Sequence, residues 1–449
     1  MKKYSYYLLL IVFISNSLAL RAQDGFKFFE EGKRYEDISF QLINNLVVIP
    51  IEINGKGLNF IFDTGVNKTI VFNASKTDTV FYRTKTIHKL RGLGEGEPVD
   101  AIISQNNRFR IKNLISHNQS VYIVLKDDFD LSAKMGTTIH GVIGYDVLKN
   151  LVVKIDYRRK KMRLFDPKFF RFKDCSKCQT FPLTIYQNKP YIDVEVVMND
   201  SISNIPVKML IDSGGSDAMW LFEHTRKEIV TPEKYFDDFL GVGLSGTIYG
   251  KRSRIKGLNI GQFQLKEPTV SFLDSIATKN ARRFEERNGS IGSNILKRFK
   301  VWIDYPNKRM MLQKQSSLKG GFDYNMSGIE VIHNGKILVQ EKTTRFGQSY
   351  GRDGNSTHSA GNSVSLVTSY EYKFKPSFIV NDVVKGSPAD ISGVKKGDVL
   401  LKINGKHVHD FKLSEIIGKF MKKPNHRIKL LIDRDGVQME IEFRLKKIV

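Results

Sequence analysis

The chain has little cysteine. Its 449 residues include only Cys175 and Cys178, in the order Cys-Ser-Lys-Cys. A structural zinc site needs four ligands, and neither a second cysteine pair nor closely spaced histidines accompany these two, so no metal or other cofactor is expected. The flanking residues also lack the βαβ pattern of a thioredoxin-like redox site. If the protein is exported to an oxidising compartment, as the N-terminal residues discussed next predict, the two cysteines are close enough in sequence to form a small local disulfide between Cys175 and Cys178.

Long apolar segments are also scarce. The run at residues 6–14 follows Lys2 and Lys3, and polar residues interrupt it well before the roughly 20 apolar residues that span a bilayer. A positive start, a short apolar run and then small residues are typical of a cleaved signal peptide. We therefore expect residues 1–22 to be an export signal. The mature protein would lie in the periplasm or outside the cell, two compartments that the sequence does not separate.

The net charge is strongly positive, at +24 from 71 basic and 47 acidic side chains. The basic residues are spread along the chain, and no helix-turn-helix, zinc-finger or ribonucleoprotein signature is present, which argues against nucleic acid as a partner. A charge of this size instead favours contact with anionic envelope surfaces such as lipid headgroups or acidic polysaccharide.

An internal duplication organises the first two-thirds of the chain. Three landmarks occur twice, in the same order. Asp-Thr-Gly at 63–65 is repeated as Asp-Ser-Gly at 212–214, and Gly-Val-Ile-Gly at 141–144 is repeated as Gly-Ser-Ile-Gly at 289–292. Ile-Asp-Tyr occurs at 155–157 and again at 303–305. The offsets are 149 (212 − 63), 148 (289 − 141) and 148 (303 − 155). Such regular spacing indicates two copies of one domain, over residues 23–170 and 171–319.

Each copy has the pattern of a β domain. β-branched and apolar runs, separated by turn residues, predict strands at 46–53, 58–62, 191–197 and 207–211. Helical periodicity is limited to short stretches that follow the two Gly-x-Ile-Gly sequences. The predicted fold is mainly β, with each copy a small closed or nearly closed barrel.

The two Asp-Thr/Ser-Gly sequences predict a pair of catalytic carboxylates, Asp63 and Asp212. Two aspartates held close together share one proton, so that one acts as a base toward water while the other protonates a carbonyl oxygen. A duplicated fold supplies one such group from each copy. A single Asp-Thr-Gly would instead be read as an ordinary turn at the end of a strand.

The neighbours of these aspartates have predicted supporting roles. The hydroxyls of Thr64 and Ser213 would brace each loop by hydrogen-bonding the opposite one. Gly65 and Gly214 would allow the tight turn that brings the carboxylates and the backbone together.

Both copies resemble the retropepsins, the small barrels of retroviral and related aspartic peptidases, and their fusion in one chain is similar to pepsin. The resemblance rests on the apolar-apolar-Asp-Thr/Ser-Gly loops and on the Val-Ile-Gly and Ser-Ile-Gly boxes, and it covers residues from about 40 to 315. It implies an aspartic endopeptidase in which the boxes pack behind the catalytic loops. Two positions depart from the retropepsin pattern: Val66 and Gly215 stand where Ala or Ser is usual.

Glycine-rich segments predict flaps. Residues 91–98 and 241–249 contain a fourth, weaker repeat at an offset of 149 (241 − 92), and mobile hairpins there would close over a substrate. The flap candidates are Gly92, Gly94, Gly241, Gly243 and Tyr249. Plain surface hairpins are the alternative.

The C-terminal residues 320–449 change in character. The series Gly-Ser-Pro-Ala at 386–389, Gly-Val-x-x-Gly-Asp at 393–398 and Ile-Asn-Gly at 403–405 resembles the PDZ domains of bacterial envelope proteases. Such α+β domains bind an extended peptide or a C-terminus beside a sheet edge. Ser327, Gly328 and Ile329 are weak candidates for the carboxylate-binding loop, and the polar stretch 345–363 predicts an exposed insertion.

The predicted function is therefore an exported aspartic endopeptidase whose PDZ-like domain binds a substrate or partner peptide. One chain supplies both aspartates, so an oligomer is not required. The alternative is a non-catalytic peptide-binding or scaffold protein built from the same domains.

Overall fold

The computed structural model describes residues 25–72, 86–94, 96–124, 130–173, 175–202, 204–348 and 364–449, without the side chains of Val242, 345–348 and 364–367. The predicted signal at 1–22 and most of the polar insertion lie outside the described residues. The chain forms two compact units. The first contains the duplicated residues up to 129 and from 139 to 322. The second contains residues 130–138 and 323–448. The fold is mainly β, as predicted.

The first lobe is a nine-stranded sheet in the order β1-β9-β6-β10-β5-β4-β8-β7, with β3 paired to β4. Its strands are β1 (Lys27–Phe28), β3 (Gln41–Ile43), β4 (Leu46–Ile53), β5 (Lys56–Phe62), β6 (Thr69–Val71), β7 (Thr86–Leu90), β8 (Val99–Ile111), β9 (Leu114–Val124) and β10 (Gly141–Ile143). Asn54 and Gly55 join β4 to β5 with φ values of 50° and 91°, the left-handed conformation that a two-residue hairpin turn requires.

The second lobe repeats this plan in a ten-stranded sheet, β18-β19-β22-β17-β23-β16-β15-β20-β21, with β14 paired to β15. Its strands are β14 (Thr184–Tyr186), β15 (Lys189–Val197), β16 (Ile205–Ile211), β17 (Met219–Phe222), β18 (Phe236–Gly243), β19 (Gly246–Arg254), β20 (Gly257–Ile260), β21 (Phe263–Lys266), β22 (Thr269–Leu273) and β23 (Arg287–Ile291). In both lobes the strand before the Asp loop pairs in parallel with the strand of the glycine box, β5 with β10 and β16 with β23. The duplication is therefore present in the topology as well as in the motifs.

A shared sheet joins the two lobes. Its order is β13-β25-β24-β11-β12-β2, from the strands β2 (Tyr35–Ser39), β11 (Val152–Asp156), β12 (Lys161–Phe165), β13 (Cys178–Pro182), β24 (Phe299–Asp304) and β25 (Arg309–Lys314). The central pair is β11 with β24, one from each lobe, antiparallel from Val152↔Asp304 to Asp156↔Lys300. The two Ile-Asp-Tyr repeats lie on this pair, so the third landmark marks the interface between the copies.

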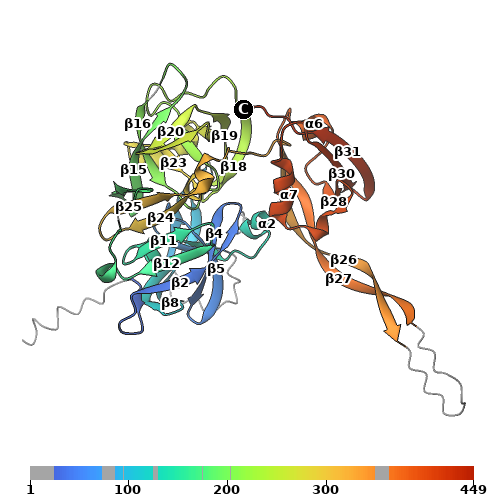
Figure 1. Cartoon of the computed structure of the whole chain (residues 1–449), viewed down its shortest axis with the longest axis horizontal. Helices are drawn as coiled ribbons and strands as arrows, with labels where there is room; N and C mark the ends of the chain where they lie inside the picture. The colour runs from blue at the N-terminus through green and yellow to red at the C-terminus, as the bar shows by residue number, and fades with distance from the viewer. Residues whose placement is uncertain are drawn as a thin grey trace, which may run out of the picture. The chain divides into compact units, whose positions relative to one another are not determined.

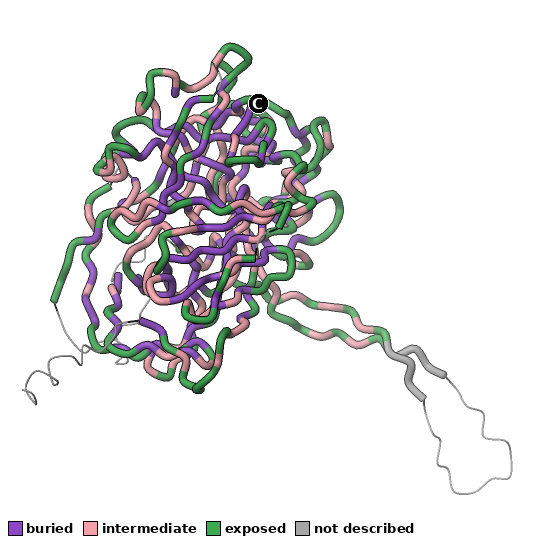
Figure 2. Tube along the Cα trace, turned by 60° about the vertical axis from the view of Figure 1, so that its left-hand side comes forward, coloured by how far each residue is buried: buried purple, intermediate pink, exposed green. Residues whose placement is uncertain are grey.

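One apolar core runs through both lobes. It includes buried side chains from Phe26 to Phe322, with Phe60, Phe62, Phe109 and Phe299 among the fully enclosed ones. Figure 2 marks the buried residues in purple, and stretches of them alternate with intermediate and exposed residues along the trace. Burial of this alternating apolar face stabilises the sheets, and it fixes the positions of the loops at the ends of β5 and β16.

The second unit is the C-terminal α+β domain with one added helix. Its elements are α2 (Leu131–Met135), β26 (Ile329–Gln348), β27 (Val364–Val383), α6 (Pro388–Ile391), β28 (Val399–Ile403), β29 (Lys406–His407), α7 (Leu413–Phe420), β30 (Arg427–Arg434) and β31 (Val437–Arg444). The sheet order is β26-β27-β28-β30-β31. Helix α2 comes from the chain between β9 and β10, and Lys134 on it lies 3.2 Å from the carboxylate of Glu330 on β26.

Strands β26 and β27 continue well beyond this sheet as a two-stranded ribbon (Figure 1). Tyr370, Tyr372 and Phe374 alternate along β27, so they share one face of the ribbon, and all three are exposed. The predicted polar insertion thus begins and ends within paired strands, since Gln348 pairs with Val364.

Two smaller features complete the description. A disulfide joins Cys175 and Cys178, whose Cα atoms are 5.2 Å apart. Within the described ranges, no helix combines the length and the apolar character needed to cross a membrane.

Candidate active site

The two aspartates lie at the ends of matched buried strands. Asp63 follows β5 and Asp212 follows β16. Each backbone N–H donates to the last carbonyl of the parallel partner strand, Asp63 to Ile143 at 2.8 Å and Asp212 to Ile291 at 3.0 Å. The sheet therefore fixes the point at which each chain leaves its strand.

The glycine boxes pack directly behind the Asp loops, as the resemblance implies. A Cβ atom on Gly144 would lie 1.8 Å from the carbonyl oxygen of Asp63, and one on Gly292 would lie 2.3 Å from that of Asp217. Such distances leave no room for a side chain. The short helices α3 (Tyr145–Leu148) and α5 (Ser293–Leu296) follow at once. Both boxes therefore need glycine just before the helix, because the Asp loop lies against the backbone there.

Thr64 and Ser213 hold the two loops together. The Thr64 N–H donates to the Ser213 hydroxyl at 3.0 Å, and the Ser213 N–H donates to the Thr64 hydroxyl at 3.0 Å. Each hydroxyl also donates across the pseudo-twofold axis, Thr64 to the carbonyl of Ile211 and Ser213 to that of Phe62. Both side chains are buried, so these four bonds form without competition from water.

This bracing brings Asp63 and Asp212 together. A Cβ on Gly214 would lie 2.2 Å from the carboxyl carbon of Asp63, and a Cβ on Gly65 would lie 3.2 Å from an oxygen of Asp212. Each glycine therefore sits against the aspartate of the other lobe. Burial and the neighbouring carboxylate of Asp212 raise the pKa of Asp63 from 3.8 to about 8, because both disfavour a second negative charge.

The two carboxylates have different hydrogen-bond partners. Asp63 Oδ1 accepts from the N–H of Gly65 at 2.7 Å, whereas Asp212 Oδ1 accepts from those of Gly214 at 3.1 Å and Gly215 at 2.9 Å. Hydrogen bonds to a carboxylate favour its charged form. The extra bond comes from Gly215, one of the two departures from the retropepsin pattern. Asp212 Oδ1 thus has one more backbone donor than Asp63 Oδ1.

The flap candidates are placed at two hairpin tips that meet. The β18–β19 turn reaches the segment between β7 and β8, where the Ser245 N–H donates to the Leu93 carbonyl at 3.1 Å and the Gly96 N–H donates to that of Ser245 at 2.6 Å. The Gly92 N–H donates to the Ser245 hydroxyl at 3.0 Å. A Cβ on Gly243 would lie 2.1 Å from the Leu93 carbonyl oxygen, so glycine is required for this approach.

The remaining flap candidates have separate roles. Gly94 and Gly241 have φ values of 113° and 147°, and a Cβ on Gly94 would also meet the Ser245 carbonyl at 2.6 Å. Tyr249 is 55% exposed, and its ring packs edge-on against Phe239. The structure therefore places Tyr249 on the hairpin without burying it.

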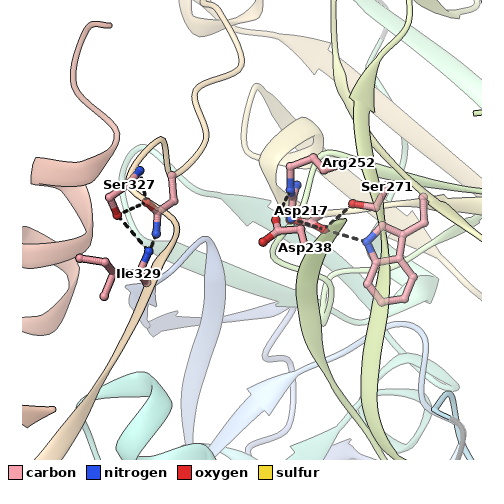
Figure 3. A network of polar contacts seen from close by, with 8 residues as sticks. Asp217, Asp238, Arg252, Ser271, Ser327 and Ile329 are labelled. Atoms are coloured by element: carbon pink, nitrogen blue, oxygen red, sulfur yellow. Dashed lines mark hydrogen bonds and ion pairs between the residues drawn. The ribbon is translucent and has the colours of Figure 1, made fainter. Parts of the chain in front are cut away.

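A buried ionic network that no sequence motif predicts ties the β18–β19 hairpin to the second Asp loop. Arg252 on β19 lies 2.5 Å from Asp238 on β18 and 3.1 Å from Asp217 (Figure 3). Asp217 also accepts from Trp220 Nε1 at 2.8 Å and from the Ser271 hydroxyl at 3.2 Å. Burial raises the pKa of Asp238, although Arg252 opposes the shift.

The carboxylate-loop candidates of the C-terminal unit already have internal partners. The Ser327 N–H donates to Asn325 Oδ1 at 3.0 Å, and the Ile329 N–H donates to the Ser327 hydroxyl at 3.1 Å. Gly328 has a φ of 82°, as a tight loop requires. A peptide carboxylate bound here would have to share these N–H groups.

Comparison with known proteins gives two family matches. Residues 49–147 match the aspartyl protease family model, and residues 379–434 match that of the PDZ domain. An aspartic proteinase from Irpex lacteus aligns over 64% of this chain and 99% of its own, with 13% identity and a TM-score of 0.39.

Two curated relatives are similar over short spans. A probable periplasmic serine endoprotease of the DegP-like type from Chlamydia pneumoniae is 38% identical over 76 residues, 17% of this chain. A probable CtpA-like serine protease from Staphylococcus aureus is 25% identical over 113 residues, 25% of this chain. The chain spans only 15% and 21% of these relatives. The family matches confirm the resemblance predicted from the motifs: residues 49–147 match an aspartyl protease domain, and residues 379–434 match a PDZ domain.

Proposed function

We propose that the protein is an aspartic endopeptidase that hydrolyses peptide bonds with a water held between Asp63 and Asp212. The observation that carries the proposal is the contact of each loop with the aspartate of the opposite lobe, maintained by the buried Thr64 and Ser213. Like charges this close favour a pair that shares one proton. The raised pKa of Asp63 supports the same arrangement.

The different environments of the aspartates support a separate role for each. Asp212, with two backbone donors, is the base that takes a proton from the water as its oxygen attacks the carbonyl carbon. Asp63 carries the shared proton and donates it to the carbonyl oxygen, which gives a tetrahedral diol. Asp212 then passes its proton to the leaving nitrogen as the C–N bond breaks, and Asp63 recovers a proton from the diol hydroxyl. The pair returns to its starting state.

The partner and the location belong to the same proposal. The PDZ domain would bind an extended peptide of the substrate or of a partner beside its sheet. Action in the periplasm or outside the cell agrees with the predicted signal at 1–22 and with the periplasmic relative from Chlamydia pneumoniae. A disulfide at Cys175 and Cys178 also suits an oxidising compartment.

Inhibitor selectivity tests the proposal. The full chain without its first 22 residues would be assayed on a quenched-fluorescence peptide library near pH 6. A statine-type peptide should inhibit cleavage, because its hydroxyl takes the place of the attacking water. A sulfonyl fluoride directed at serine nucleophiles should leave the rate unchanged. The reverse pattern would assign serine chemistry, and absence of cleavage with any peptide would favour the non-catalytic scaffold.

The pH dependence of hydrolysis should extend to neutral pH. Because Asp63 must be protonated and its pKa is raised to about 8, kcat/KM should persist at pH 7 and fall as the pH rises through about 8. The pKa of Asp63 is higher in the folded protein than its unfolded value of 3.8, so the folded state keeps a proton that the unfolded state loses. The free energy of unfolding should therefore decrease as the pH rises from about 4 to about 8. A pH–rate profile confined to pH values below 5 would contradict the assignment.

A further inference from the structure

Two basic side chains of the second lobe lie close to the aspartate pair. Lys189 is the first residue of β15 and Arg287 the first residue of β23. Tyr191 pairs with Leu210 in the antiparallel β15–β16 register, so Lys189, two residues before Tyr191, lies level with Asp212, two residues after Leu210. Arg287 pairs with Lys208 on the same strand β16, and the charges of both cations act on Asp212. Neither residue belongs to a recognised motif, and the mechanism above uses neither.

Arg287 is enclosed but incompletely satisfied. Only 3% of its surface is exposed. Its Nε donates to the Gly289 carbonyl at 3.2 Å, its guanidinium lies 5.0 Å from the ring centre of Phe222, and it donates a hydrogen bond to the Tyr191 hydroxyl. Its Nη2 atom has no hydrogen-bond partner among the described residues. An unsatisfied donor on a buried cation is costly, so an acceptor oxygen that reached Nη2 would be bound favourably.

The duplication provides an internal comparison. Arg287 corresponds to Ile139 in the first lobe, at the offset of 148 (287 − 139) that relates the glycine boxes. Lys189 corresponds to Leu46, because each is the first residue of the strand that follows a left-handed two-residue turn. The first lobe thus has two buried apolar residues at these places. The fold itself does not require cations there.

The local charges do not balance. An aspartate pair that shares one proton carries one negative charge, whereas Lys189 and Arg287 together carry two positive charges. One positive charge therefore has no negative counterpart in this group of four residues. A substrate carboxylate would supply the missing negative charge, and the hydrogen bond between a carboxylate and a guanidinium is among the stronger ones in proteins.

We propose that Lys189 and Arg287 form a carboxylate-binding subsite beside the aspartate pair, which makes the enzyme selective for peptides with an acidic group next to the cleaved bond. The proposal deepens the proposed function and rests on it. The acidic group is either an aspartate or glutamate side chain or the C-terminal carboxylate of a short peptide.

Matched peptides test this selectivity. In one series, glutamate or glutamine occupies each of three positions on either side of the cleaved bond; in the other, the peptide ends in a free acid or an amide. At one position glutamate should raise kcat/KM by about tenfold to a hundredfold over glutamine, as expected of a hydrogen bond to a charged group. A preference for the free acid alone would identify the C-terminus as the source.

The variants Lys189→Met and Arg287→Met should each reduce this glutamate-to-glutamine ratio toward one. Arg287→Lys keeps a charge and should retain part of the ratio, which covers the case in which the methionine variant does not fold. Lys256→Met is the matched control, because Lys256 is a half-exposed cation of the same lobe paired with Asp200, and its ratio should equal that of the wild type.

Binding measurements separate this proposal from the proposed function. Statine peptides that carry glutamate or glutamine at the preferred position would be titrated by calorimetry. Tighter binding of the glutamate ligand, lost in Lys189→Met, supports the subsite whatever the turnover. Cleavage with equal rates and equal binding for both ligands would overturn the subsite and leave the peptidase intact. Absence of cleavage together with selective binding would overturn the peptidase alone.

Discussion

Replacement of Asp212 by asparagine should reduce kcat/KM for peptide hydrolysis by about a thousandfold or more, because general base catalysis contributes about 10²–10⁴-fold and no other described group is placed to replace it. The fold should survive the change. Asparagine Oδ1 can still accept from the Gly214 and Gly215 N–H groups, so the loop keeps its bonds and only the charge is lost. Asp63→Asn should have a similar effect, because the pair would then lack its shared proton.

The measurement is the initial rate on a quenched-fluorescence peptide, with circular dichroism to verify folding. Asp193→Asn is the matched control, since Asp193 lies on β15 of the same lobe with 72% of its side chain exposed. Its rate should equal that of the wild type. If Asp212→Asn cleaved within tenfold of the wild-type rate, the proposed mechanism would be wrong.

Arg252→Met should destabilise the first unit by about 3–5 kcal/mol, because removal of one partner leaves buried charges uncompensated. Arg252 is the cation between Asp217 and Asp238, and its loss would leave both carboxylates in a buried site. The β18–β19 hairpin would also lose its link to the second Asp loop. We therefore expect lower activity together with the lower stability.

Denaturant unfolding followed by tryptophan fluorescence measures this change. The chain has two tryptophans, Trp220 and Trp302, and both belong to the first unit, so the signal excludes the PDZ domain. Arg163→Met is the control: Arg163 pairs with Asp37 at 2.6 Å with both side chains 36% exposed, and exposed pairs contribute about 0.2–1 kcal/mol. Adding Asp217→Asn and Asp238→Asn to Arg252→Met should recover part of the stability. Equal effects of Arg252→Met and Arg163→Met would contradict this account.

Much of the fold was accessible from the sequence, because duplication and strand alternation are local signals. The landmarks with offsets of 148 and 149 predicted the two lobes, and the runs at 46–53 and 58–62 correspond to β4 and β5. The Gly-x-Ile-Gly boxes also lie where the resemblance placed them, since a glycine is obligatory wherever two backbones come this close. The series at 386–405 predicted the PDZ domain that the family match confirms.

What the sequence did not reveal depends on contacts between distant residues. Arg252 meets Asp217 and Asp238 only after β18 and β19 pair beside the second Asp loop, and no motif contains the three. Arg287 was missed for the same reason, although comparison of the two copies position by position would have drawn attention to an arginine opposite Ile139. Residues 130–138 belong to the second unit, and this segment is too short to show a periodic pattern from which that could be predicted.

The sheet shared between the lobes has a consequence for how the chain acquires its structure. Strand β11 finds one of its two neighbours, β24, about 150 residues later, so the first repeat cannot complete its hydrogen bonding while the second is still being synthesised. Cooperative folding therefore requires both repeats. A fragment that ends near residue 170 would present an unprotected edge strand, which is a template for association with another chain. The smallest autonomous portion of the first unit is thus the fused pair, even though each repeat has the plan of a complete barrel.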